Sequence, residues 1–144
     1  MSELLIINHQ LDKKILYEIE NSISKKKIYY INFVENYQID LKKKNFIQIN
    51  NGNSFQSFCL KKIKSIFKII KSKKISKDFW RMKISEFNLA DKFWKDYLKK
   101  EYILEIIKIK KIKKIKVFLN SEDYMFNKLI EKLHSAQIYK DNKN

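Results

Sequence analysis

Hydrophobic and charged residues alternate most clearly between Tyr102 and Leu119, a segment that includes the stretch ILEIIKIKKIKKIKVFL. Successive side chains of a β-strand point to opposite faces, so this pattern predicts a strand with one apolar face and one lysine-covered face. The spacing of three between Ile109, Ile112 and Ile115 is also compatible with a helix. We take the strand as the main prediction, beginning at about Tyr102.

The segments from Asn45 onward predict a regular order of strands and helices. Gly52 marks a turn, and Ser54 and Ser121 are suited to begin helices as N-caps. Residues 86–100 are compatible with a helix, an ordered loop or a short helical turn. The predicted elements are strands at 46–50, 79–85, about 102–119 and 136–139, and helices at 54–70 and 121–134. This β-α-β-β-α-β order predicts an α+β fold of the ferredoxin-like type, with two helices on one face of a four-stranded antiparallel sheet.

The first 44 residues read as an addition to that unit. Apolar residues recur at helical spacing from Leu11 to Ile23, and Ile28 to Val34 is rich in aromatic and β-branched residues, which favours a strand. The run from Lys42 to Lys44 then separates this region from the rest. We therefore predict an N-terminal extension at 1–44 and a ferredoxin-like RNA-binding domain at 45–144.

The charge of the chain is strongly one-sided. There are 32 basic and 16 acidic residues, a formal net charge of +16, and every basic residue except Arg81 is a lysine. Lysines that crowd several consecutive elements repel one another unless a polyanion lies across them, which points to a nucleic acid. The abundance of Lys, Ile and Asn, with one Gly and no Pro, is typical of an A/T-rich genome, so part of the charge reflects codon bias.

The residues that support catalysis or metal binding are sparse. His9 and His134 have no Cys, Asp or Glu at ligand spacing, and Cys59 lies on the apolar stripe of a predicted helix. One glycine excludes a glycine-rich phosphate loop. We therefore expect no enzyme activity, no metal, no cofactor and no small-molecule substrate. We also expect neither a membrane span nor a targeting signal, because the longest apolar runs are short and the N-terminal segment carries Glu3 and Asp12.

From about Asn45 the chain resembles the family of the tenth protein of the small ribosomal subunit. The resemblance rests on the element order and on worn versions of the family's motifs. The hairpin-tip proline and glycine and the Pro-His pair of the family are absent, and Phe87 stands at the histidine position. The matching segments are Lys61-Lys62-Ile63, KKISKDFWRMKISEF with Ser85 at the family's serine, Lys92 to Tyr97 with Lys99, and Asn120 to Asp123 with the helix and strand that follow.

The resemblance implies a structural role without catalysis, in which the chain binds ribosomal RNA in the head of the small subunit beside other ribosomal proteins. Together with the composition, it suggests an organelle-encoded protein of a mitochondrial matrix ribosome. The aromatic stripe Phe55/Phe58/Phe67 has the spacing of a core and, secondly, the capacity to stack on bases. The residues expected to bind RNA are Lys71, Lys73, Lys74, Lys77, Arg81, Lys83, Lys108, Lys110, Lys111, Lys113 and Lys114.

Two alternatives remain open at this level. The first alternative is a small Lys-rich accessory subunit of an organellar membrane or respiratory complex. The second is a free regulator that binds RNA or DNA. An accessory subunit predicts lysines scattered over all faces, whereas an RNA-bound protein predicts lysines gathered on one surface.

Overall fold

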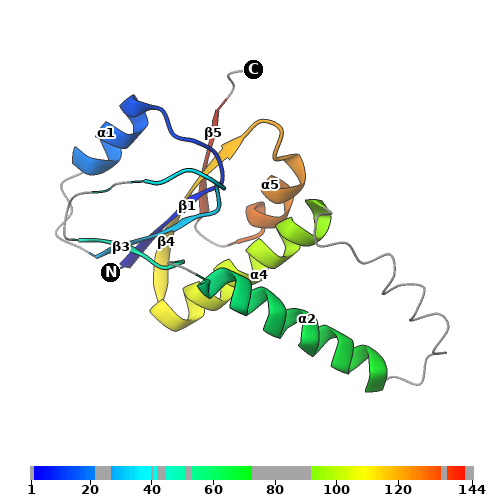
Figure 1. Ribbon diagram of the computed structural model, residues 1–144. Helices are drawn as coiled ribbons and strands as arrows, with labels where there is room; N and C mark the ends of the chain where they lie inside the picture. Colours follow the sequence, from blue (N-terminus) through cyan, green and yellow to red (C-terminus); the bar gives the residue numbers. More distant parts are fainter. Residues whose placement is uncertain are drawn as a thin grey trace.

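The computed structural model describes residues 2–21, 27–39, 41, 45–50, 53–72, 92–133 and 136–141. Over these residues the chain forms one sheet with helices on both faces (Figure 1). The elements are β1 (Ser2–Ile7), α1 (Lys13–Asn21), β2 (Ile28–Asn32), β3 (Phe46–Gln48), α2 (Ser54–Ser72), α4 (Lys92–Lys110), β4 (Ile112–Asn120), α5 (Tyr124–Glu131) and β5 (Ala136–Asp141).

The sheet has five strands in the spatial order β3-β2-β1-β4-β5, and all four neighbouring pairs among these described strands are parallel. A fold that combines helices with a sheet is therefore confirmed. The antiparallel ferredoxin-like arrangement is not the one observed, because that arrangement requires neighbouring strands to run in opposite directions. The strand predicted at 79–85 lies outside the described residues.

Two hydrophobic cores cover the two faces of the sheet. On one face, Leu4 and Ile6 of β1 pack with side chains of α4 and α5, and Phe55 and Phe58 of α2 pack against the same cluster. On the other face, Leu5 of β1 belongs to a second cluster, against which the apolar residues of α1 pack. The helices expected near 54–70 and 121–134 do lie on the same face. A sheet buried on both faces explains why β1 reads as the uninterrupted apolar run LLII.

Strand β1 lies in the middle of the sheet. It pairs with β2 through Glu3 and Ile28, and with β4 through Glu3 and Lys114. The boundary expected at residue 44 therefore falls inside one sheet, with three strands contributed from before residue 49 and two from after residue 111. Residues 1–44 are not appended to a complete sheet, because β1 and β2 supply part of its centre.

The segment predicted as a strand from Tyr102 is a helix as far as Lys110. Leu98, Tyr102 and Ile106 are all buried and follow one another at a spacing of four, so one face of α4 packs into the core. The strand prediction relied on the alternation of Ile and Lys at 107–110, and it is wrong there. Ile109 is 61% exposed, so the alternating isoleucines do not form one buried face. The strand prediction is correct only from Ile112 to Leu119.

The remaining boundaries agree closely with the sequence pattern. Helix α2 begins at Ser54 as expected. Helix α5 begins later than the predicted Ser121, with Asp123 at its N-cap position. Of the undecided segment 86–100, the described part from Lys92 belongs to helix α4.

Candidate nucleic-acid interface

The amino ends of the parallel strands share one edge of the sheet, and exposed lysines gather there. Lys27 immediately precedes β2, and α4 runs back to the same edge before the chain enters β4. We call this surface the basic edge, and all of its members are exposed. It consists of Lys27, Lys108, Lys110, Lys111, Lys113 and Lys114.

The turn between α4 and β4 sets the direction of several of these side chains. Lys108 and Lys110 lie in the last turn of α4, not in a strand as predicted. Their positive charges are favourable there, because the carboxyl end of a helix carries a partial negative charge. Lys111 has a φ of 53°, in the left-handed region that commonly ends helices. The chain then reverses into β4.

Lys113 and Lys114 are consecutive residues of β4, and both are exposed. In a regular strand with one buried face, one of two successive side chains would point into the core. Here the register between β1 and β4 shifts between Ser2 and Glu3, and the pairing of β4 with β5 begins only at Ile115. The amino end of β4 therefore extends past β5 while it stays paired with β1, and both lysine side chains are exposed to solvent.

One nearby lysine has an acidic partner across the sheet. The Nζ atom of Lys116 lies 3.3 Å from Oε1 of Glu3, so this charge is already balanced within the protein. Lys110 packs its ammonium over the ring of Tyr29, with 5.3 Å between Nζ and the ring centroid. The basic edge thus adjoins an aromatic side chain at the start of β2.

The first group of residues expected to bind RNA, from Lys71 to Lys83, lies almost entirely outside the described residues. Lys71 lies in the last turn of α2, but only its backbone is described. Lys73, Lys74, Lys77, Arg81 and Lys83 lie outside the described residues. Of the eleven residues, the structure brings together Lys108, Lys110, Lys111, Lys113 and Lys114.

Helix α2 carries a second set of lysines. Its sequence has no acidic residue, and Lys61, Lys64 and Lys68 are exposed. Lys62 forms an ion pair of 3.5 Å with Glu101 of α4. A groove of about 420 Å³ follows the crossing of the two helices, with Phe58 and Lys108 among its lining residues. This groove is more mixed in charge than the basic edge, because Glu101 and Glu105 also line it.

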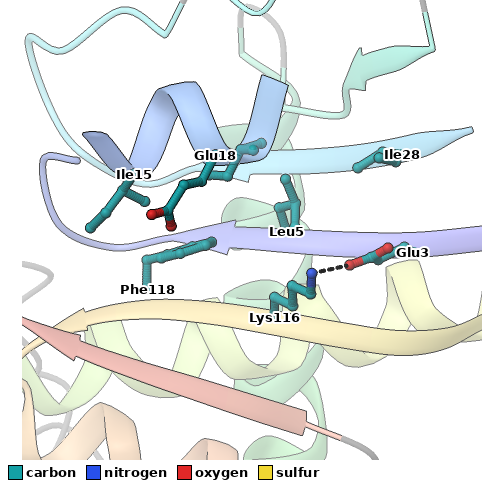
Figure 2. A pocket seen from close by; sticks show the side chains of 8 residues that line it. Glu3, Leu5, Ile15, Glu18, Ile28, Lys116 and Phe118 are labelled. Atoms are coloured by element: carbon teal, nitrogen blue, oxygen red, sulfur yellow. Dashed lines mark ion pairs between the residues drawn. The ribbon is translucent and has the colours of Figure 1, made fainter. Parts of the chain in front are cut away.

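A small hollow with a volume of about 170 Å³ lies between α1 and the sheet. Figure 2 shows the side chains that line it. Leu5, Ile15 and Phe118 form its apolar walls. The ion pair between Glu3 of β1 and Lys116 of β4 lines it from the sheet. Glu18 of α1 also lines the space. With two carboxylates beside one lysine, the hollow is unsuited to a phosphate group.

The opposite edge of the sheet, where the strands end, was not anticipated. The strand segments LLII, YYI, IQI and VFL are each followed by an asparagine, and the parallel direction of the strands brings these four asparagines to one edge. That repetition was the signal available in the sequence. The four residues are Asn8, Asn32, Asn50 and Asn120.

The asparagine side chains stabilise the loops at this edge. Asn50 donates from Nδ2 to the carbonyl of Asn32 at 2.7 Å and accepts from the Asn32 backbone N–H at 3.1 Å. Asn32 in turn donates to the Tyr37 carbonyl at 2.6 Å and accepts from the Val34 N–H at 3.0 Å. These bonds satisfy backbone groups that the sheet itself leaves unpaired beyond the strand ends.

A cleft of about 740 Å³ opens beside Asn32 and Asn50. Its walls come from the segment after β2, the end of β3, the start of α2 and the first half of α4. Phe33 and Phe55 contribute aromatic rings whose centroids are 5.1 Å apart, in an edge-to-face arrangement. We call this the carboxyl-edge cleft.

Lys99 is the most buried ammonium group of this region. Its Nζ donates to Oδ1 of Asn8 at 2.8 Å and lies 5.3 Å and 5.7 Å from the ring centroids of Phe33 and Phe126. Burial lowers the pKa of Lys99 from its ordinary value, while the neighbouring carboxylate of Asp96 opposes that shift. Lys99 therefore joins α4 to the end of β1 and presents a positive charge at the cleft.

The described residues contain no group of three or more His, Cys, Asp or Glu side chains placed to hold a metal ion. No described helix is both long and apolar enough to cross a membrane. Cys59 is half-buried, and burial raises the pKa of its thiol, which makes it a weak nucleophile at neutral pH. Comparisons with family models, with curated proteins and with solved structures found no match to this chain.

Proposed function

We propose that this chain is an RNA-binding structural protein and that its site of action is the small subunit of a mitochondrial ribosome. The observation that carries the proposal is the basic edge, where lysines from the end of α4, the turn after it, the start of β4 and the residue before β2 lie on one surface. Such a surface is stabilised when phosphate groups replace mutual repulsion with attraction.

The chemistry of the basic edge favours contacts to the nucleic-acid backbone. Lysine ammonium groups bind phosphates as point charges and do not distinguish bases. The lysines project from regular secondary structure, at the end of α4 and along β4, so the protein can meet a folded RNA as a preformed surface. This is the behaviour expected of a structural constituent of a ribonucleoprotein.

The choice of a mitochondrial ribosome rests on composition and not on the fold. The residue usage is typical of an A/T-rich genome, such as an organelle genome or a reduced bacterial one, and a ribosome is a structured polyanion of the mitochondrial matrix. The parallel sheet lacks the antiparallel order implied by the resemblance to the tenth small-subunit protein, so that resemblance adds no structural support.

Sedimentation of an organelle extract tests the proposal. We expect the chain to sediment with the small subunit at a constant ratio to its RNA, and to be released when the RNA is digested with ribonuclease. A chain that remains at the top of the gradient would contradict the proposal. Release by ribonuclease without a constant ratio would indicate a free regulator, and retention in a respiratory complex after digestion would indicate an accessory subunit.

A further inference from the structure

The carboxyl-edge cleft has the features of a ligand site that is separate from the basic edge. Its volume of about 740 Å³ is within the roughly 300–1,000 Å³ usual for small-molecule sites. In open parallel sheets, ligands bind outside the carboxyl ends of the strands, at the point where the strand order reverses. Here the cleft lies outside the carboxyl ends of β2 and β3. Lys99, which lines it, bonds to Asn8 directly after β1, next to the reversal point between β1 and β4.

The polar groups of the cleft divide into two sets. The first set consists of Asn32 and Asn50, whose side chains form hydrogen bonds with backbone groups of the cleft walls and so stabilise the walls. Gln56 and Lys95 are exposed side chains that line the cleft, and Lys99 has further N–H donors beyond the one given to Asn8. These groups are placed to bind a ligand without disturbing the fold.

The character of the lining identifies the class of ligand. The half-buried rings of Phe33 and Phe55 provide an apolar wall for a planar ring, and the amide of Gln56 can donate to and accept from its polar edge. Two ammonium groups, from Lys95 and Lys99, suit a phosphate. The exposed carboxylate of Glu35 on the same cleft suits hydroxyl or amino donors. A nucleotide combines all three requirements.

We infer that the carboxyl-edge cleft binds a single nucleotide, with the base beside the Phe33–Phe55 wall and the phosphate at Lys95 and Lys99. The nucleotide is either free in solution or one unstacked residue of a single-stranded RNA, since both present the same chemistry. The inference does not depend on RNA binding at the basic edge, which is formed by the amino ends of the strands.

Cys59 provides a built-in reporter, because it lines the cleft and is the only cysteine of the chain. The experiment measures the rate at which a small alkylating reagent modifies the purified full chain, in the presence of AMP, GMP, CMP, UMP, adenosine, inorganic phosphate or a six-nucleotide RNA. Equilibrium dialysis gives the corresponding affinities. We expect at least one nucleoside monophosphate, or the RNA, to slow alkylation more than adenosine or phosphate alone.

Two variants locate the binding. Lys95→Glu should weaken the binding of the protective ligand by about tenfold, the loss expected for one charge-assisted contact. Lys14→Glu makes the same change of charge on α1, where Lys14 is also exposed, and should leave the affinity unchanged. Both positions are on the surface, so neither substitution should impair folding, which circular dichroism will verify.

Each result decides the inference. Protection by a monophosphate indicates a free nucleotide, and protection by the RNA alone indicates a nucleotide of a single strand. If neither protects Cys59, or if inorganic phosphate protects it equally well, the nucleotide site is refuted. Equal weakening by Lys95→Glu and Lys14→Glu would refute it as well, because the ligand would then respond only to total charge.

Discussion

Neutralising four lysines of the basic edge should change the salt dependence of RNA binding by a calculable amount. The variant carries Gln at Lys110, Lys111, Lys113 and Lys114, all of which are exposed, so the free energy of unfolding should change little. Glutamine suits Lys111 in particular, because its φ of 53° is unfavourable for β-branched residues. The fold therefore remains constant while the charge falls by four.

The size of the effect follows from counterion release. Each neutralised phosphate contributes about 0.7 to the salt slope for a single strand and about 0.9 for a duplex, so four lost contacts reduce the slope by about three. Between 50 and 200 mM salt, a slope difference of about three amounts to about 1.8 decades in affinity. The wild-type chain should thus lose roughly sixty times more affinity than the variant over this range.

The assay is a filter-binding or fluorescence-anisotropy titration with small-subunit RNA at several salt concentrations. The double variant Lys113→Gln/Lys114→Gln should give about half of the full change in slope. Its matched control is Lys13→Gln/Lys14→Gln, another adjacent exposed pair, at the start of α1. Helix α1 begins after β1 has ended, so this pair belongs to the opposite edge of the sheet.

An unchanged slope in the fourfold variant would show that the basic edge is a solvated surface and that RNA binds elsewhere. An equal reduction in the control pair would show that binding follows total charge without a defined surface. Either result would refute the reasoning from strand direction to a shared lysine edge.

Three further outcomes test the fold and the cleft. Phe126→Ala should reduce the free energy of unfolding by about 3–5 kcal/mol in urea titrations, because the side chain is fully buried, whereas Tyr124→Ala on the same helix should cost less than about 0.5 kcal/mol. An equal loss in both would contradict the packing of α5. Asn50→Ala should lower the free energy of unfolding by about 1–3 kcal/mol, because the backbone N–H and carbonyl of Asn32 lose their partner. Asn50→Asp keeps only the acceptor, so its free energy of unfolding should lie between those of the wild type and Asn50→Ala. Burial lowers the pKa of Lys99 in the folded state below its ordinary value of 10.5. Between the folded and the unfolded pKa, the unfolded chain therefore binds more protons than the folded one. The contribution of Lys99 to the free energy of unfolding consequently rises with pH in this window. Subtracting the pH profile of Lys99→Met from that of the wild type should isolate this rise, and a flat difference would argue against a buried ammonium.

The local pattern of the sequence determined much of the secondary structure. The polar residues before Ser54 and the apolar positions after it defined the start of α2, because caps and amphipathic spacing are properties of neighbouring residues. The alternation of Ile115, Val117 and Leu119 defined one face of β4 in the same way, and all three side chains are buried. Net charge, likewise, is a sum over residues and needed no structure.

Between Tyr102 and Lys110 the sequence was ambiguous, and the tertiary structure decided. Over a few residues, Ile and Lys can alternate as in a strand while the longer pattern fits a helix. The helix is stabilised because Leu98, Tyr102, Ile103 and Ile106 are buried on it. The last three of these pack in the core cluster that α4 shares with the sheet and α5. Whether such a segment forms a helix or a strand depends on the elements that pack against it, and the local spacing of residues does not specify those elements.

Strand direction and the two edges of the sheet were also decided only by tertiary structure. Alternation fixes which face of a strand is apolar, but it is the same for a parallel and an antiparallel partner. The run LLII reads as a short apolar segment until helices cover both faces of β1. Once the strands are parallel, the lysines before β2 and β4 meet at one edge, and the asparagines at or just after the ends of β1, β2, β3 and β4 meet at the other. The sequence by itself therefore determined the net charge and the elements with a clear local pattern, such as α2 and the second half of β4. The common direction of the strands created both the basic edge and the carboxyl-edge cleft.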